Sequence, residues 1–335
     1  MNRLKIFYSF LVLALLMSSC KNDRLKIDVS KNNTTVSIFR LEKELFEKKP
    51  DYEKHLKLFG KLGDFYKNYV EIMINAGPIK DSLTINGLNL FTQDSEIKGV
   101  YKDVISEYPD LSGLNAEFSN AFKHYNHYFP NKNIPEVITY ISGFNYAIAA
   151  SDSVLGVGLD MYLGKDYEFY RMIGFPQYKT YSMRNEYITH DAVKGWIATE
   201  FEFDPVEKDM LEQIIHHGKI MYIMDAVFPY SEDSLKIGYT KEQLDWCVNN
   251  QVNIWSHFID KQLLFSSNSK EIMTYLNEGP FTPGMPRESP PKLGIWLGWQ
   301  IVKAYMERQD EVDLEKLLEA KAPYILKESK YKPRK

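Results

Sequence analysis

The centre of the fold is predicted by residues 182–229, which read SMRNEYITHDAVKGWIATEFEFDPVEKDMLEQIIHHGKIMYIMDAVFP. This pattern is typical of two consecutive amphipathic helices joined by a short acidic turn. In the first helix Ile188, Ala192 and Trp196 recur at intervals of four residues, so they share one face. We therefore expect that face to be buried in the core.

The second helix has a start signal of its own. Asp204 is expected at the N-cap, Pro205 at the first helical position and Glu207 two positions later. Gly195 and Gly218 lie inside the two predicted helices, where a glycine costs about 1 kcal/mol relative to alanine. We interpret both glycines as places where the backbones of these two helices approach each other closely.

Polar residues on the same two helices raise the question of a metal site. The five residues from His190 to Lys194 read HDAVK, which has the outline of H-E-x-x-H. In that motif two histidines bind zinc and the glutamate acts on a metal-bound water. Lys194 occupies the second ligand position, where a protonated ammonium repels a cation and offers no lone pair. The pattern therefore predicts a broken hydrolytic zinc site.

Two other interpretations of these residues remain open. In one, His190 and Asp191 are surface partners of Lys194, and His217 is a hydrogen-bonded core histidine between the two helices. In the other, His190 and Asp191 bind zinc together with His216 or His217 in an atypical site.

The first twenty residues predict the cellular compartment. Residues 1–19 have a positive start followed by a short apolar run, as in a signal peptide. The sequence MSSC then ends at Cys20 like a bacterial lipobox, which predicts cleavage before Cys20 and acylation of it. A plain N-terminal membrane anchor and a cleaved signal without lipid are the alternatives. Residues 20–34 are polar, and we expect them to form a tether.

Composition narrows the class of protein. The 335 residues are 44% hydrophobic, which is enough for a sizeable core. The formal net charge of −4 and the absence of a basic stripe argue against nucleic acid as a partner. Apart from Cys20, the only cysteine is Cys247, which excludes an internal disulfide in the mature chain. Cys247 falls on an apolar helix face, so we expect a buried thiol.

The rest of the chain predicts an α+β fold that is predominantly helical. Residues 136–164 contain β-branched and aromatic runs broken by glycines, which predict a small antiparallel sheet with a hairpin near residues 150–153. Because we find no low-complexity linker, we expect one domain over residues 35–325. Residues 326–335 are expected to form a basic tail.

Several motifs together resemble the GldB-type gliding-motility lipoproteins of the Bacteroidetes. The motifs are the lipobox at Cys20, RLEKELF (40–46), VGLDMYLG (157–164), AVKGWIATEF (192–201), IIHHGKIMYIMDAVFP (214–229) and PRESPPKLGIWLGWQIVKAYM (286–306). The resemblance implies a lipid-anchored protein of the cell envelope that works with the gliding and type IX secretion machinery. It also implies the periplasmic face, with the outer membrane favoured over the inner.

The same stretches are similar to gluzincin zinc peptidases. That similarity implies a gluzincin-like fold in which His190 is the first ligand, Asp191 the base, Lys194 the second ligand and His216 or His217 the third. The departures at these positions favour a degenerate peptidase scaffold, without cofactor or catalysis, that acts through contacts with other machinery proteins. An envelope zinc peptidase is the alternative, and a periplasmic binder of peptide or glycan is a third possibility.

The proline-rich loop of residues 279–291 is a candidate surface for such contacts, because a rigid loop loses little entropy on binding. The alternative is that this loop packs back over the core.

Overall fold

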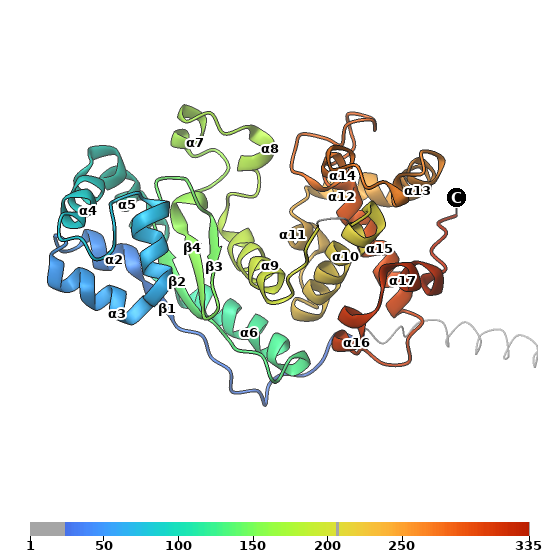
Figure 1. Ribbon diagram of the computed structural model, residues 1–335, viewed down its shortest axis with the longest axis horizontal. Helices are drawn as coiled ribbons and strands as arrows, with labels where there is room; N and C mark the ends of the chain where they lie inside the picture. Colours follow the sequence, from blue (N-terminus) through green and yellow to red (C-terminus); the bar gives the residue numbers. More distant parts are fainter. Residues whose placement is uncertain (1–23, 206–207, 335) are drawn as a thin grey trace, which may run out of the picture.

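The computed structural model describes residues 24–205 and 208–334 (Figure 1). Its strands are β1 (Ile38–Arg40), β2 (Glu136–Tyr140), β3 (Ile148–Ala150) and β4 (Val154–Gly158). The helices before and within the sheet region are α2 (Leu41–Phe46), α3 (Tyr52–Asn68), α4 (Thr84–Gln93), α5 (Ser95–Glu107), α6 (Ser112–Tyr128), α7 (Glu168–Met172) and α8 (Gln177–Thr180). The later helices are α9 (Ile188–Glu200), α10 (Met210–Val227), α11 (Asp233–Ile237), α12 (Lys241–Asn249), α13 (Gln251–Asp260), α14 (Ser269–Leu276), α15 (Leu293–Met306), α16 (Leu314–Glu319) and α17 (Ala322–Ser329). The predicted helical α+β class is confirmed.

The sheet has four strands in the order β1-β2-β4-β3. The predicted hairpin is present, because β3 and β4 pair antiparallel with Ala150 opposite Leu155. The prediction of an antiparallel sheet was wrong for the other two pairings, β1–β2 and β2–β4, which are parallel. The reason is that β1 lies far outside residues 136–164, on which the prediction was based. In addition, β4 lies between β2 and β3 in the sheet, so it pairs with β2 as well as with β3.

Each face of the sheet buries its own set of apolar side chains. Val137 and Leu155 join the large cluster formed with α6, α9, α10 and α15. Ile138 and Val154 point to the other face and join the smaller cluster formed with α2 and α3. This alternation follows from the two-residue period of a strand. In Figure 1 the sheet accordingly stands between the α2–α5 helices and the α9–α17 helices.

Helix α10 is the central helix of the large cluster, and its closest partner is α15. A Cβ atom added to Gly218 would lie 2.4 Å from the backbone carbonyl of Gly298, and one added to Gly298 would lie 1.8 Å from the carbonyl oxygen of Ile214. The predicted close approach at Gly218 is therefore present, but its partner is α15 and not α9. Gly195 on α9 instead faces the side chain of Ile148 on β3.

The second central helix begins later than predicted. Asp209 is the N-cap of α10, and its carboxylate accepts a hydrogen bond of 2.9 Å from the backbone N–H of Glu212. Asp204 and Pro205 lie in the connection before it, and Glu207 lies outside the described residues. Asp204, Pro205 and Lys208 are not helical, so the cap is provided by the aspartate five residues after the one expected.

The described part of the predicted tether lies against the body. We call residues 24–37 the strap. Along α6, Ile38 N–H donates to Asn115 Oδ1, Val36 N–H donates to Ser119 Oγ, and the Asn32 side chain donates to the carbonyl of Lys123. These α6 positions are four residues apart, so the strap follows one side of that helix, below the sheet in Figure 1.

The end of the chain is also packed. Residues 326–329, which we expected to belong to a basic tail, complete α17. Beyond them the ring of Tyr331 lies edge-on to Trp255, with ring centres 5.4 Å apart. Among the described residues, no helix is both long and apolar enough to cross a membrane.

Candidate functional site

The polar residues of the central helices line a cavity of about 630 Å³. It lies between the edge strand β3 and its preceding loop, α9, α10 and the start of α15. Its lining residues are Asn145, Tyr146, Ala147, Ile148, Tyr162, Asp191, Lys194, Gly195, Ala198, His216, His217, Ile220, Met221, Ile237, Glu278, Lys292 and Ile295. Four of the polar residues considered for a metal site therefore line this cavity together: Asp191, Lys194, His216 and His217.

Asp191 and Lys194 form an ion pair on the α9 side of the cavity. The Nζ atom of Lys194 lies 3.3 Å from Asp191 Oδ1 and also donates to the backbone carbonyl of Lys236 at 3.3 Å. The second carboxylate oxygen of Asp191 accepts a hydrogen bond of 3.3 Å from the hydroxyl of Tyr162. Burial, followed by the charge of Asp191, raises the pKa of that tyrosine. The lysine thus places an ammonium charge beside the carboxylate.

His190 is turned away from the cavity. Only 7% of its surface is exposed, its ring stacks on Phe228 with centres 4.3 Å apart, and Nδ1 donates to the carbonyl of Glu186 at 3.2 Å. Nε2 has no hydrogen-bond partner among the described residues. Burial lowers the pKa of His190 to about 4, so the imidazole is neutral at pH 7.

The interpretation of His190 as a surface partner of Lys194 was therefore wrong, whereas Asp191 does pair with Lys194. Successive residues of a helix point in directions about 100° apart, so Asp191 can face the cavity while the adjacent His190 is buried.

His216 and His217 begin the cavity wall on α10. The ring of His216 stacks on Phe203, with centres 4.5 Å apart and planes 11° apart. Burial, followed by the charges of His217 and Lys219, lowers the pKa of His216 to about 4. Burial and the charge of Lys292 lower the pKa of His217 as well. Both rings are therefore neutral at pH 7, and His217 is a half-buried lining residue rather than a fully buried core residue.

The donor set of the cavity does not fit a zinc site. Zinc in a protein needs at least three ligands from His, Cys, Asp and Glu. Within residues 24–205 and 208–334, no three such side chains lie close enough together to hold a metal ion. His216 and His217 line the cavity, but His190 does not. The ammonium groups of Lys194 and Lys292 line the same cavity as Asp191 and these two histidines.

Sequence reasoning missed the second ammonium group. Lys292 stands just before α15 with a φ of +57°, and its Nζ donates to Glu278 Oε1 at 2.5 Å and to the carbonyl of Ile237 at 3.2 Å. Burial lowers its pKa. No helical period could have indicated this lysine, because it lies at the end of the proline-rich loop. That loop is partly packed: Thr282 is fully buried and donates to the carbonyl of Pro290 at 2.7 Å, whereas Arg287 and Glu288 are exposed.

A second missed residue shapes the rim of the cavity. The carboxylate of Asp160 is fully buried and accepts hydrogen bonds from the backbone N–H groups of Phe144 at 2.7 Å and Ser142 at 3.1 Å. These bonds hold the loop whose following residues, Asn145 to Ile148, line the cavity. Burial raises the pKa of Asp160 to about 6. The VGLDMYLG motif contains this aspartate, but the sequence pattern gave it no role.

Comparison with known proteins supplies the family. The family described as gliding motility protein GldB matches residues 22–333, nearly the whole chain. The chain belongs to the GldB family. This confirms the resemblance predicted from the sequence motifs. No curated protein and no solved structure matches the chain, so the likeness to gluzincins stays a prediction.

Membership makes the chain a gliding motility protein, which indicates involvement with the motility machinery. The GldB family is designated a lipoprotein family, which suggests a membrane-anchored protein of the cell envelope. Cys20 itself, with residues 1–19, lies outside the described residues. The other cysteine, Cys247, is fully buried as predicted, and burial raises its pKa, which suits an inert thiol.

Proposed function

We propose that this GldB-family chain is a lipid-anchored, non-catalytic component of the gliding and type IX secretion machinery that acts through protein contacts. Cys20 carries the lipid, and the folded part faces the periplasm, with the outer membrane favoured. The observation that supports the absence of catalysis is the ion pair of Asp191 with Lys194, which puts a positively charged side chain beside this carboxylate and at the second ligand position of the motif.

Metal analysis of the purified full-length protein tests the non-catalytic part. We expect no stoichiometric zinc and no peptidase activity. Stoichiometric zinc that is lost in Asp191→Asn, together with hydrolysis that is lost in the same variant, would overturn this part of the proposal. Asp191 is the preferred target because it is partly exposed and lines the cavity, whereas His190 is buried outside it.

A motility assay tests the same point in cells. A chromosomal His216→Gln, His217→Gln double variant removes both imidazoles from the cavity and keeps polar side chains there. We expect normal gliding from this strain. A strain that carries the protein at its usual level but does not glide would show that the imidazoles have a chemical or binding role.

Labelling with a radioactive fatty acid tests the anchor. We expect incorporation into the wild-type chain and none into Cys20→Ala. Cell fractionation of the labelled protein then shows which membrane holds it, and recovery with the inner membrane would contradict the favoured location.

A further inference from the structure

The strap begins with a clamp. The two terminal nitrogens of Arg24 donate to the backbone carbonyls of Gln309 at 2.5 Å and Met306 at 2.6 Å. Met306 is the last residue of α15, where a helix leaves carbonyl groups without partners of its own, and Gln309 lies in the turn that follows. A guanidinium shared between these two carbonyls is held by charge-assisted hydrogen bonds. The first described residue of the chain is therefore fixed to the body.

This clamp limits how far the body can stand from a lipid on Cys20; the argument rests on the anchoring proposed above. Cys20 precedes Arg24 by four residues, and an extended chain covers at most about 3.6 Å per residue, so the reach is about 14 Å. A strap that was loose up to Ile38 would allow about 65 Å. With the clamp closed, the end of the molecule that carries α15, α16 and α17 lies at the bilayer.

Opposite charges divide this end of the molecule. Residues 310–319, which include α16, carry five acidic side chains and one basic. Residues 327–335, which include the end of α17 and the tail after it, carry five basic side chains and one acidic. Phospholipid headgroups of negative charge attract a basic segment by about 1 kcal/mol for each lysine or arginine at the surface. The tail side, and not the α16 side, is therefore favoured against the headgroups.

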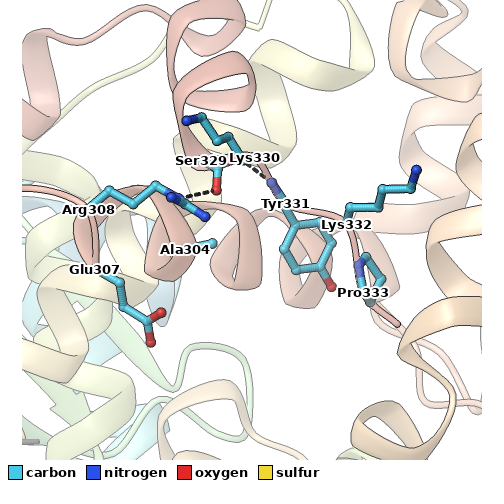
Figure 2. A pocket seen from close by; sticks show the side chains of 8 residues that line it. All are labelled: Ala304, Glu307, Arg308, Ser329, Lys330, Tyr331, Lys332 and Pro333. Atoms are coloured by element: carbon cyan, nitrogen blue, oxygen red, sulfur yellow. Dashed lines mark hydrogen bonds between the residues drawn. The ribbon is translucent and has the colours of Figure 1, made fainter. Parts of the chain in front are cut away.

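The basic residues are presented from an ordered base. Figure 2 shows Arg308 reaching the end of α17, where its Nε donates to the carbonyl of Ser329 at 2.9 Å. Ser329 Oγ accepts the backbone N–H of Tyr331 at 3.1 Å. These contacts border a surface hollow of about 380 Å³, from which the exposed side chains of Lys330 and Lys332 extend. Lysines on a backbone that is held in place lose less entropy on meeting a surface than those of a free tail.

We propose that the lipid-anchored chain lies on its membrane with α17 and the C-terminal tail against anionic phospholipid headgroups, in an orientation set by the Arg24 clamp. An exposed aromatic ring of α17 fits this surface, because tyrosine is favoured at the level of the headgroups. Tyr324 is 54% exposed and lies beside Tyr305, with ring centres 6.2 Å apart.

Energy transfer to labelled lipid tests the orientation. Full-length acylated protein is placed in vesicles of phosphatidylethanolamine and phosphatidylglycerol that contain a headgroup-labelled acceptor. A donor dye is attached at Lys327→Cys on α17 or at Lys102→Cys on α5, two exposed positions with the same change of charge. The buried thiol of Cys247 does not compete for the dye. We expect strong transfer from position 327 and weak transfer from position 102.

Two variants separate the contributions of clamp and charge. Arg24→Ala lengthens the reach of the anchor, and a triple change of Lys330, Lys332 and Arg334 to glutamate reverses the charge of the tail. Each is expected to reduce the difference in transfer between the two dye positions. A matched triple change of Lys48, Lys49 and Lys80 to glutamate, at the opposite end of the molecule, should leave that difference unchanged.

The outcomes distinguish this inference from the proposed anchoring. Acylated protein that shows equal transfer from both positions would overturn the orientation and leave the lipid anchor intact. A clear difference that survives both the Arg24→Ala and the tail variants would overturn the role given to clamp and tail. A chain that carries no lipid on Cys20, as shown by mass measurement of the same sample, would overturn the anchoring and this inference together.

Discussion

Single residues of the cavity region show how burial changes the chemistry that a sequence motif predicts. His190 heads a motif with the outline of a metal site, yet its ring stacks on Phe228 and its pKa is lowered by burial. Asp191, the next residue, keeps its charge partner Lys194 at the cavity wall. The motif predicted the ion pair correctly, but a sequence pattern does not show which of two adjacent side chains turns inward.

The buried His190 should make the protein sensitive to acid. Its pKa is about 4 in the folded state and about 6.5 in the unfolded chain, so the unfolded chain binds the proton first as pH falls. Stability from this group is complete above pH 6.5 and declines as pH falls towards 4, by roughly 3 kcal/mol in all. Urea unfolding at pH 7 and pH 4 should therefore show that the free energy of unfolding falls less between these pH values in His190→Leu than in the wild type.

The exposed His127, whose neighbours impose no comparable burial, provides the control for this measurement. His127→Leu is expected to change with pH as the wild type does. An equal decrease in the free energy of unfolding from pH 7 to pH 4 in the wild type and in His190→Leu would contradict the assignment of a neutral, buried imidazole.

At the scale of helices and strands, the sequence predicted which elements form better than which elements touch. The two central helices, the β3–β4 hairpin and the helical class follow from local period and turn signals. The pairing of β1 with β2 and the contact of Gly218 with α15 do not, because both depend on residues distant in the chain. The cavity was partly predictable because Asp191, Lys194, His216 and His217 lie on the two central helices. Lys292 was not predictable as a lining residue, because it lies far from these helices in the sequence, just before α15.

The crossing of α10 and α15 can be tested at Gly298. A methyl group there would lie 1.8 Å from the carbonyl oxygen of Ile214, so the two helices must separate. We expect Gly298→Ala to lower the free energy of unfolding by about 3 kcal/mol, at the upper end of the usual range for overpacking. Gly99→Ala in α5 is the matched control, since no atom lies within 4 Å of its added Cβ and alanine favours a helix by up to about 1 kcal/mol. Thermal unfolding of both variants checks the contrast.

A buried ion network joins α10, α11 and α15 beside this crossing. Asp225 is 5% exposed and contacts Lys236 at 2.8 Å, Lys303 at 3.4 Å and the indole N–H of Trp299 at 2.8 Å. Asp225→Ala leaves a buried ammonium without this partner, so we expect a loss of about 3–5 kcal/mol in chemical unfolding.

Glu311→Ala removes a comparable ion pair from an exposed place, where Glu311 and Lys316 are both mostly in solvent. We expect a loss below about 1 kcal/mol for it. Equal losses of unfolding free energy in Asp225→Ala and Glu311→Ala would mean that burial does not determine how much these ion pairs contribute to stability.

At the scale of the whole molecule, the strap joins the beginning of the described chain to helices that come much later in it. It runs along α6 from the edge of the sheet to the end of α15, and so from the sheet to the α9–α17 helices in Figure 1. The polar composition of residues 20–34 predicted a tether, but it could not predict the contacts with α6 and α15, because hydrogen bonds to distant carbonyls leave no trace in local hydropathy.

Limited proteolysis measures how firmly the strap is held. In Arg24→Ala we expect faster cleavage within residues 24–34, because two charge-assisted hydrogen bonds are lost, and an unchanged rate in the helices. Lys31→Ala replaces an exposed cation in the same segment and should be cut at the wild-type rate. Unchanged cleavage in Arg24→Ala would show that the contacts with α6 hold the strap alone.

The clamp also bears on the order in which the chain takes its final shape. Arg24 is made long before the carbonyls that it binds, which lie 282 and 285 residues later in the chain. The contact cannot form until Met306 and Gln309 have been synthesised, and closing so long a loop is slow compared with forming local helices. The start of the strap is thus made early and placed late, after the end of α15 has formed.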